Sequence, residues 1–103
     1  MATPALKTVI SSINRALWGE VSTKLRSVQF SLDGSRIAIR FFFDETPDDG
    51  DLNSMASVGA EVAADFPGCT VSEEAVATEA NCPVPHDAGW RTAFARKEPS
   101  LAR

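Results

Sequence analysis

The chain lacks the long apolar run, the export signal and the cysteine content that would mark a membrane or secreted protein. Its most apolar stretch covers only a few residues around Phe42, far short of the ~20 that cross a bilayer. Its first residues show no basic segment followed by an apolar one, so a cytoplasmic protein is expected. Cys69 and Cys82 are too few for a disulfide-rich secreted scaffold, and we expect reduced, partly buried thiols.

Groups for nucleophilic catalysis or zinc binding are also scarce. The single histidine, His86, lies in a stretch whose composition predicts a loop. A dyad of Cys82 and His86 is therefore a weaker interpretation than an exposed loop histidine. The spacing of Cys69, Cys82 and His86 matches no common zinc motif.

The acidic residues have spacings that argue against calcium binding and acid–base catalysis. A calcium loop that began at Asp44 would have Asp49 where the pattern needs glycine and Met55 where it needs glutamate. Glu73 and Glu74 are neighbours on a predicted strand, so their side chains point to opposite faces and do not share a proton. No glycine-rich phosphate loop is present. We therefore expect no catalytic residue, metal or cofactor.

What the chain does have is an uneven distribution of charge. Residues 1–40 contain six bases and two acids, residues 41–90 contain eleven acids and no base, and residues 91–103 contain four bases and one acid. A block of carboxylates free of counter-ions repels phosphate backbones and attracts basic proteins. We therefore expect a protein partner, and neither nucleic acid nor a membrane.

Apolar periodicity predicts two helices. Thr3 and Pro4 are typical of an N-cap and a first helical residue, and apolar residues then recur at helical spacing through residues 4–18. A second periodic segment begins after three aspartates, whose charges favour the positive end of a helix, and ends before Pro67.

Two runs of alternating apolar residues flank Asp33-Gly34, which predicts two strands joined by a type I′ turn. If Leu32 pairs with Ser35, the apolar residues of both strands share one face of the sheet. The other face is then polar or only partly covered.

Residues 69–78 and 90–97 predict two further strands, although the alternation is weaker there. The expected fold is α+β with the order α-β-β-α-β-β, a four-stranded mainly antiparallel sheet with both helices packed on one face. Residues 1–98 are expected to form a single domain, and residues 99–103 a flexible tail.

Four segments together resemble a known family: residues 16–21 (ALWGEV), 25–28 (LRSV), 39–44 (IRFFFD) and 61–67 (EVAADFP). The family comprises small bacterial immunity proteins of contact-dependent growth inhibition systems. The resemblance implies a cytoplasmic protein that binds and neutralises the toxin domain, commonly a nuclease, of a large surface exoprotein. It implies no particular binding face, because such immunity proteins use diverse faces.

The leading hypothesis is an immunity protein, a monomer or weak homodimer, that blocks the active or substrate-binding surface of a basic toxin. Its acids would contact the toxin from the loop before the second helix and from the third strand. These candidate residues are Asp44, Glu45, Asp48, Asp49, Asp51, Glu73, Glu74 and Glu79.

An alternative hypothesis is a homo-oligomeric structural or adaptor domain without a toxin partner. Its half-covered sheet would pair with that of a second copy. The contact would bury Ser27, Gln29, Ala38 and Phe42.

Overall fold

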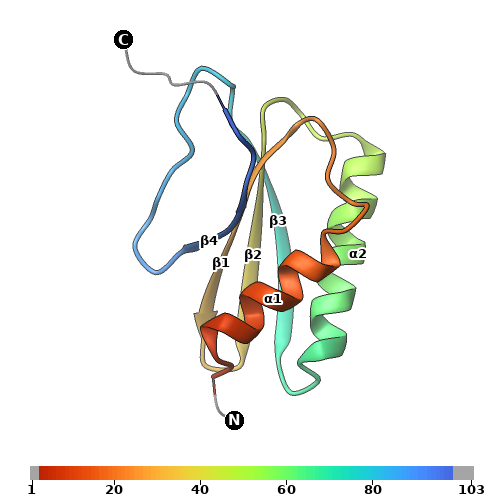
Figure 1. Cartoon of the computed structure of the whole chain (residues 1–103), viewed down its shortest axis with the longest axis vertical. Coiled ribbons are helices and arrows are strands. Elements are labelled where there is room, and N and C mark those ends of the chain that lie inside the picture. The colour runs from red at the N-terminus through yellow and green to blue at the C-terminus, as the bar shows by residue number, and fades with distance from the viewer. Residues whose placement is uncertain (1–2, 99–103) are drawn as a thin grey trace.

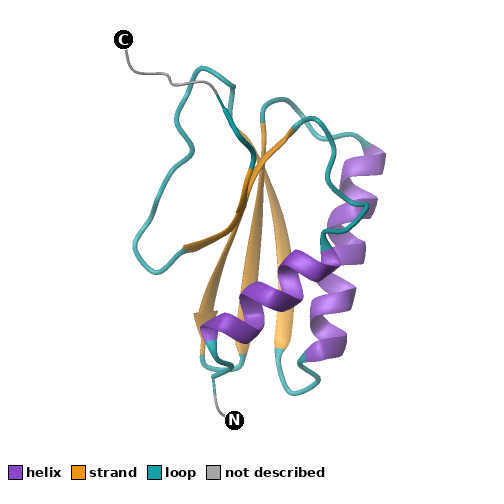
Figure 2. Ribbon diagram, viewed as in Figure 1, coloured by secondary structure: helices purple, strands orange, loops and turns teal. Residues whose placement is uncertain are grey.

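A four-stranded sheet carries both helices on one face in the computed structural model, which describes residues 3–98 (Figure 1) (Figure 2). The expected α+β fold and the order α-β-β-α-β-β are confirmed. The expected tail of residues 99–103 lies outside the described residues. The elements are α1 (Leu6–Ala16), β1 (Leu25–Asp33), β2 (Arg36–Phe43), α2 (Asp49–Asp65), β3 (Thr70–Ala77) and β4 (Arg91–Ala95).

The strand order across the sheet is β3-β2-β1-β4. β1 is antiparallel to both of its neighbours, whereas β3 is parallel to β2, so the sheet is mixed. The parallel pairing follows from α2, because a helix between two neighbouring strands returns the chain to the end from which it started. As a result, β2 and β3 finish at the same end of the molecule.

The β1–β2 hairpin differs in register from the prediction by two residues. Leu32 pairs with Ile37 instead of Ser35, so the two-residue turn is Gly34-Ser35. Only Gly34 of these two has a positive φ, at 61°, which is the pattern of a type II′ turn and not of the predicted type I′. A shift of two residues leaves each side chain on the same face. The predicted apolar face is therefore confirmed although the predicted pairing is wrong.

The two helices begin in different ways. The predicted N-cap at Thr3 is wrong, because α1 starts after Ala5, whose carbonyl accepts the first helical hydrogen bonds and whose side chain makes none. α2 begins with a capping box. In it, the Asp48 side chain accepts from the Asp51 N–H and the Asp51 side chain accepts from the Asp48 N–H, both at 2.9 Å.

The hydrophobic core fills the space between the sheet and the two helices. α1 and α2 contact each other as well as the sheet, so each helix buries one stripe of apolar side chains. The core includes Val9, Ile13, Val28, Phe30, Ile37, Ile39, Phe41, Phe43, Val58 and Val62, all nearly inaccessible to solvent.

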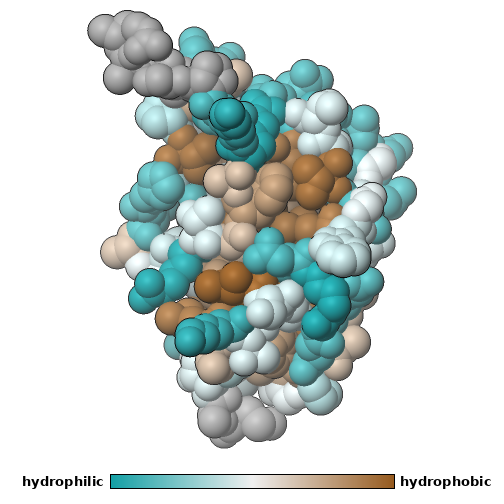
Figure 3. Space-filling view, in the orientation of Figure 1, coloured by the Kyte–Doolittle hydropathy of each residue, from teal (hydrophilic) through white to brown (hydrophobic). Residues whose placement is uncertain are grey.

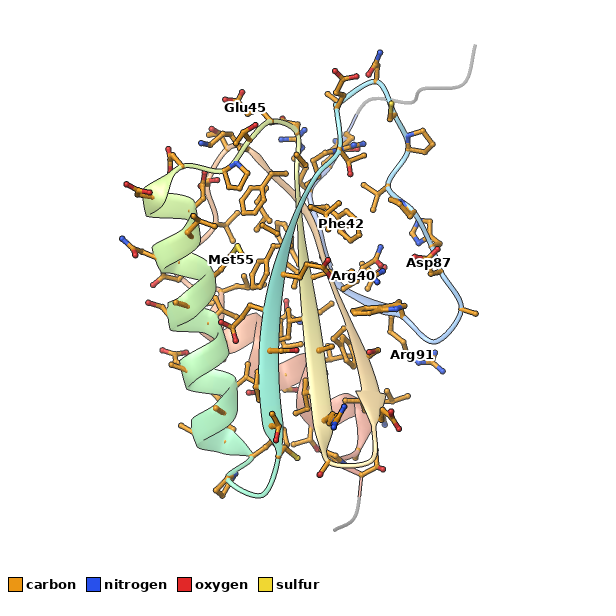
Figure 4. The ribbon with its side chains drawn as sticks, turned by 180° about the vertical axis from the view of Figure 1, so that it is seen from behind. Arg40, Phe42, Glu45, Met55, Asp87 and Arg91 are labelled. Carbon is orange, nitrogen blue, oxygen red and sulfur yellow. The ribbon has the colours of Figure 1, made fainter. Side chains whose placement is uncertain are left out.

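A long loop, residues 78–90, joins β3 to β4 on the side of the sheet that faces away from the helices (Figure 4). Arg26, which is buried in β1, donates to three carbonyls of this loop at 2.8–3.0 Å. Its remaining donors reach both carboxylate oxygens of Glu98 at 2.8 and 2.9 Å. The buried Gln29 donates to the Pro85 carbonyl at 2.8 Å. These bonds hold the loop against the sheet.

Arg40 of β2 attaches the far end of the same loop. Its guanidinium pairs with Asp87 at 3.1 Å and with Glu74 of β3 at 3.2 Å. It also lies 3.8 Å from the centre of the Trp90 ring, in a cation–π contact. Figure 4 shows Arg40 and Asp87 directed toward each other across this face.

The second face of the sheet is therefore more covered than predicted. Ser27, Gln29 and Phe42 are buried by the chain's own residues, and Ala38 is half-buried. The self-pairing hypothesis thus loses the open surface on which it depended.

The two cysteines differ in exposure and form no disulfide in the described chain. Cys69 packs against the core, as expected. Cys82 is exposed, so the expectation of partial burial is wrong for it, because its carbonyl and not its side chain faces Arg26.

Candidate partner-binding surface

Six of the eight candidate acids lie at the end of the molecule where β2 and β3 finish. The Thr78 N–H donates to the Phe43 carbonyl at 2.7 Å, which joins the segment after β3 to the segment after β2. The first turn of α2 also lies at this end of the molecule, and the labelled Glu45 shows where this end is in Figure 4. We call this region the acidic end. Its candidate acids are Asp44, Glu45, Asp48, Asp49, Asp51 and Glu79.

Lys24 neutralises part of the acidic end. Its ammonium lies 2.6 Å from a carboxylate oxygen of Asp51 and 3.0 Å from one of Asp48. These hydrogen bonds raise the pKa of Lys24. Burial by itself raises the pKa of Asp51, but the hydrogen bonds from Lys24 and from the Asp48 N–H outweigh it and lower that pKa to about 2. Asp51, only 5% exposed, is thus a nearly buried ionised group that holds the start of α2.

Asp44 is also engaged within the chain. It pairs with Arg96 at 2.8 Å, and Arg96 in turn contacts Glu98 at 3.0 Å. Hydrogen bonds from Arg26 to Glu98 lower the pKa of that carboxyl. This network fastens the segment after β4 to the end of β2.

Glu73 and Glu74 lie in the middle of β3, away from the other candidate acids. As predicted, they occupy opposite faces. Glu73 lies against Gly59 of α2, and burial raises the pKa of its carboxyl. Glu74 pairs with Arg40 on the other face. The structure therefore does not bring the eight candidates together into one surface.

Folding places bases beside much of the acidic sequence. The expectation of a block without counter-ions is wrong, because bases from residues 1–40 and 91–98 pair with it. At the acidic end, Glu45, Asp49 and Glu79 are exposed and form no ion pair with any residue in 3–98. Within residues 41–90 as a whole, the acids that form ion pairs are Asp44, Asp48, Asp51, Asp65, Glu74 and Asp87.

Trp18 is an exposed aromatic residue that was not among the predicted contacts. It directly follows the buried Leu17 after the end of α1 and is 84% exposed, while nearby Val21 is 45% exposed. The sequence contains one indication of this exposure: Leu17 fits the helical spacing of apolar residues in α1, whereas Trp18 does not. Both exposed residues border an open hollow of about 630 Å³, which Phe94 of β4 also lines. Figure 3 shows apolar surface gathered here, where the α1–β1 connection passes β4.

A second hollow, of about 390 Å³, adjoins the first and extends it to the acidic end. The two hollows share Gly19 and Val21. The charged residues lining the second hollow are Glu20, Lys24, Asp48 and Asp51. An apolar surface and an anionic one are therefore continuous.

Within residues 3–98, no group of three or more His, Cys, Asp or Glu side chains is arranged to hold a metal ion. In the same part of the chain, neither helix combines the length and the apolar composition needed to cross a membrane.

Comparison with known protein families gives one match that covers nearly the whole chain. A family model described as "MafI2 immunity protein" matches residues 7–98. The match includes all four strands, α2 and all but the first residue of α1. No curated protein matches the chain.

Proposed function

The chain belongs to the MafI2 immunity protein family, and from this premise we propose that it neutralises a toxin by covering the toxin's active or substrate-binding surface. An immunity protein acts by binding, so the family implies a toxin partner and favours a role without catalysis. The observation that carries the proposed mode of action is the set of exposed carboxylates at one end of the fold that form no ion pair with residues 3–98.

The proposed toxin is a basic nuclease domain delivered by contact-dependent growth inhibition. A nuclease needs a cationic groove for the phosphate backbone, and a carboxylate surface competes for such a groove. The net charge of −4 supports a cationic partner. We place the encounter in the cytoplasm, where such a nuclease meets its substrate.

The candidate acids have different tasks in this proposal. Glu45, Asp49 and Glu79 contact the toxin directly, because they are exposed and unpaired in the described chain. The paired Asp44, Asp48 and Asp51 fix the loop and the first turn of α2 that present them. Glu73 and Glu74 extend the negative field along β3.

The double substitution of Glu45→Gln and Asp49→Asn tests the proposed site. We expect the rate constant for association with the cognate toxin domain to fall at least ~10-fold at low salt, because electrostatic steering is lost. Biolayer interferometry at two salt concentrations measures it, and the difference from wild type shrinks at the higher one. Survival of cells that co-express the toxin domain reports neutralisation.

The matched control is the double substitution of Asp33→Asn and Glu61→Gln. Both acids are exposed and form no ion pair with residues 3–98, and they lie at the hairpin turn and in α2, away from the acidic end. The control removes the same charge but is expected to slow association far less. Equal slowing by both variants would show that net charge, and not this site, drives binding.

A further inference from the structure

Trp18 is held outside the core by the path of the chain after α1. Leu17 ends the helix and packs inward, and the next residue is therefore directed away from the core. Gly19, with φ at +79°, then turns the chain in a conformation that most other residues avoid. Because Trp18 is 84% exposed, its ring contributes little to the burial that stabilises the fold.

Exposed tryptophan beside an apolar hollow is typical of a binding hot spot. Tryptophan is enriched among residues that dominate binding energy, because a large rigid ring buries much surface at a low entropic cost. Here the ring borders a hollow whose other walls include Leu17, Val21 and Phe94. The hollow is open, so a side chain of another molecule can enter it without any movement of the core.

Charge beside the hollow defines the chemistry of the occupant. The adjoining hollow is lined by three acidic residues, Glu20, Asp48 and Asp51, and by one base, Lys24. Lys24 is already shared between the two aspartates, and Glu20 forms no ion pair with residues 3–98. An excess of two negative charges therefore lies next to the apolar wall.

We propose that the toxin inserts an apolar side chain into the hollow beside Trp18 and places a lysine or arginine of the same segment against Glu20 and Asp48. This inference rests on the proposed function and specifies which surface of the chain the toxin covers. A second copy of this chain fits less well, since a symmetric contact would bring two anionic hollows together.

Trp18→Ala tests the apolar half of this contact. Calorimetric titration with the cognate toxin domain is expected to show affinity reduced about 30-fold or more, the effect of losing a hot-spot residue. Trp18→Phe, which keeps an aromatic ring, is expected to retain most of the wild-type affinity for the toxin. Glu20→Lys tests the charged half and is expected to slow association about 10-fold at low salt.

Leu6→Ala is the matched control, because Leu6 is an exposed apolar residue, 40% accessible, at the other end of α1. It is expected to leave affinity within about twofold of wild type, since it lies outside an interface at the C-terminal end of α1. The midpoint of thermal unfolding should be unchanged by Trp18→Ala, which separates a binding effect from unfolding.

The possible outcomes separate this inference from the proposed function. If wild type binds and neutralises the toxin while Trp18→Ala binds equally well, the inference is wrong and the proposed function stands. If wild type itself neither binds nor neutralises the toxin, both fail. A third outcome is that sedimentation shows a dimer for wild type and a monomer for Trp18→Ala, while the affinity for the toxin is unchanged. That result would assign the surface to a second copy of this chain and overturn the inference.

Discussion

Lys24, the residue just before β1, is linked to the first turn of α2 through its ammonium group. That group bridges Asp48 and Asp51, the two residues of the capping box. The same two aspartates therefore accept from two N–H groups at the helix start and also bind a positive charge. This arrangement fixes the backbone that presents Asp49 and Glu45 to solvent.

Asp51→Ala tests this role. We expect the free energy of unfolding at pH 7 to fall by about 1–3 kcal/mol, because the substitution removes one arm of the cap and a buried partner of Lys24. Urea unfolding measures the change. Asp49→Ala is the control, since Asp49 lies in the same helical turn but is exposed and makes no ion pair with residues 3–98. An equal loss in both variants would contradict the role of the Lys24 contact.

The effect of Asp51→Ala should depend on pH with a definite sign. The folded pKa of Asp51 is lowered to about 2, so its carboxylate stabilises the fold above pH ~4 and loses this effect as pH falls from ~4 to ~2. The pKa of Lys24 is raised, so its contribution is present below pH ~10 and is constant in this window. The difference in stability between wild type and variant should therefore shrink between pH 4 and pH 2. A stability difference that stays constant from pH 4 to pH 2 would contradict the stabilising role of the ionised Asp51 carboxylate.

At the scale of elements, the contact between α2 and β3 contains an unusual pair. Glu73 lies on the core-facing side of an edge strand, where its side chain occupies the space above Gly59. An inward-directed charge on an edge strand opposes pairing with another chain. Glu73 is exposed overall, but partial desolvation beside α2 raises the pKa of its carboxyl.

A double-mutant cycle measures this pair. In a Glu73→Ala background, Gly59→Ala should raise the free energy of unfolding by about 1 kcal/mol, the difference in helix propensity between the two residues. In the wild-type background the gain should be smaller, because a Cβ at position 59 would overlap the Glu73 carboxylate and displace it. Denaturant unfolding of the four proteins gives the coupling. Equal effects in the two backgrounds would mean that Glu73 does not pack there.

At the scale of the whole molecule, the sequence predicted what depends on local periodicity. The order of elements followed from the helical and alternating spacing of apolar residues. The apolar face of the hairpin was predicted correctly although the register was wrong, because side chains on a strand return to the same face every two residues. The start of α1 was predicted wrongly, because the local preference for an N-cap at Thr3 does not decide it: the helix begins after Ala5, whose side chain makes no capping bond.

The candidate site was less predictable because it depends on contacts distant in sequence. Lys24 is separated from Asp48 by a complete hairpin, and Arg96 from Asp44 by most of the domain, so charge counting treated these acids as free. The exposure of Trp18 depends on how the chain turns at Gly19, which composition does not reveal.

The central claim is that a toxin covers the surface formed by the α1–β1 connection and the acidic end. Hydrogen–deuterium exchange of this chain, with and without its cognate toxin domain, tests it most directly. We predict slower exchange on binding at residues 17–24 and 44–51, with little change at the hairpin turn around Gly34. Protection confined to that turn or to loop 78–90, with none at residues 17–24 and 44–51, would contradict the account.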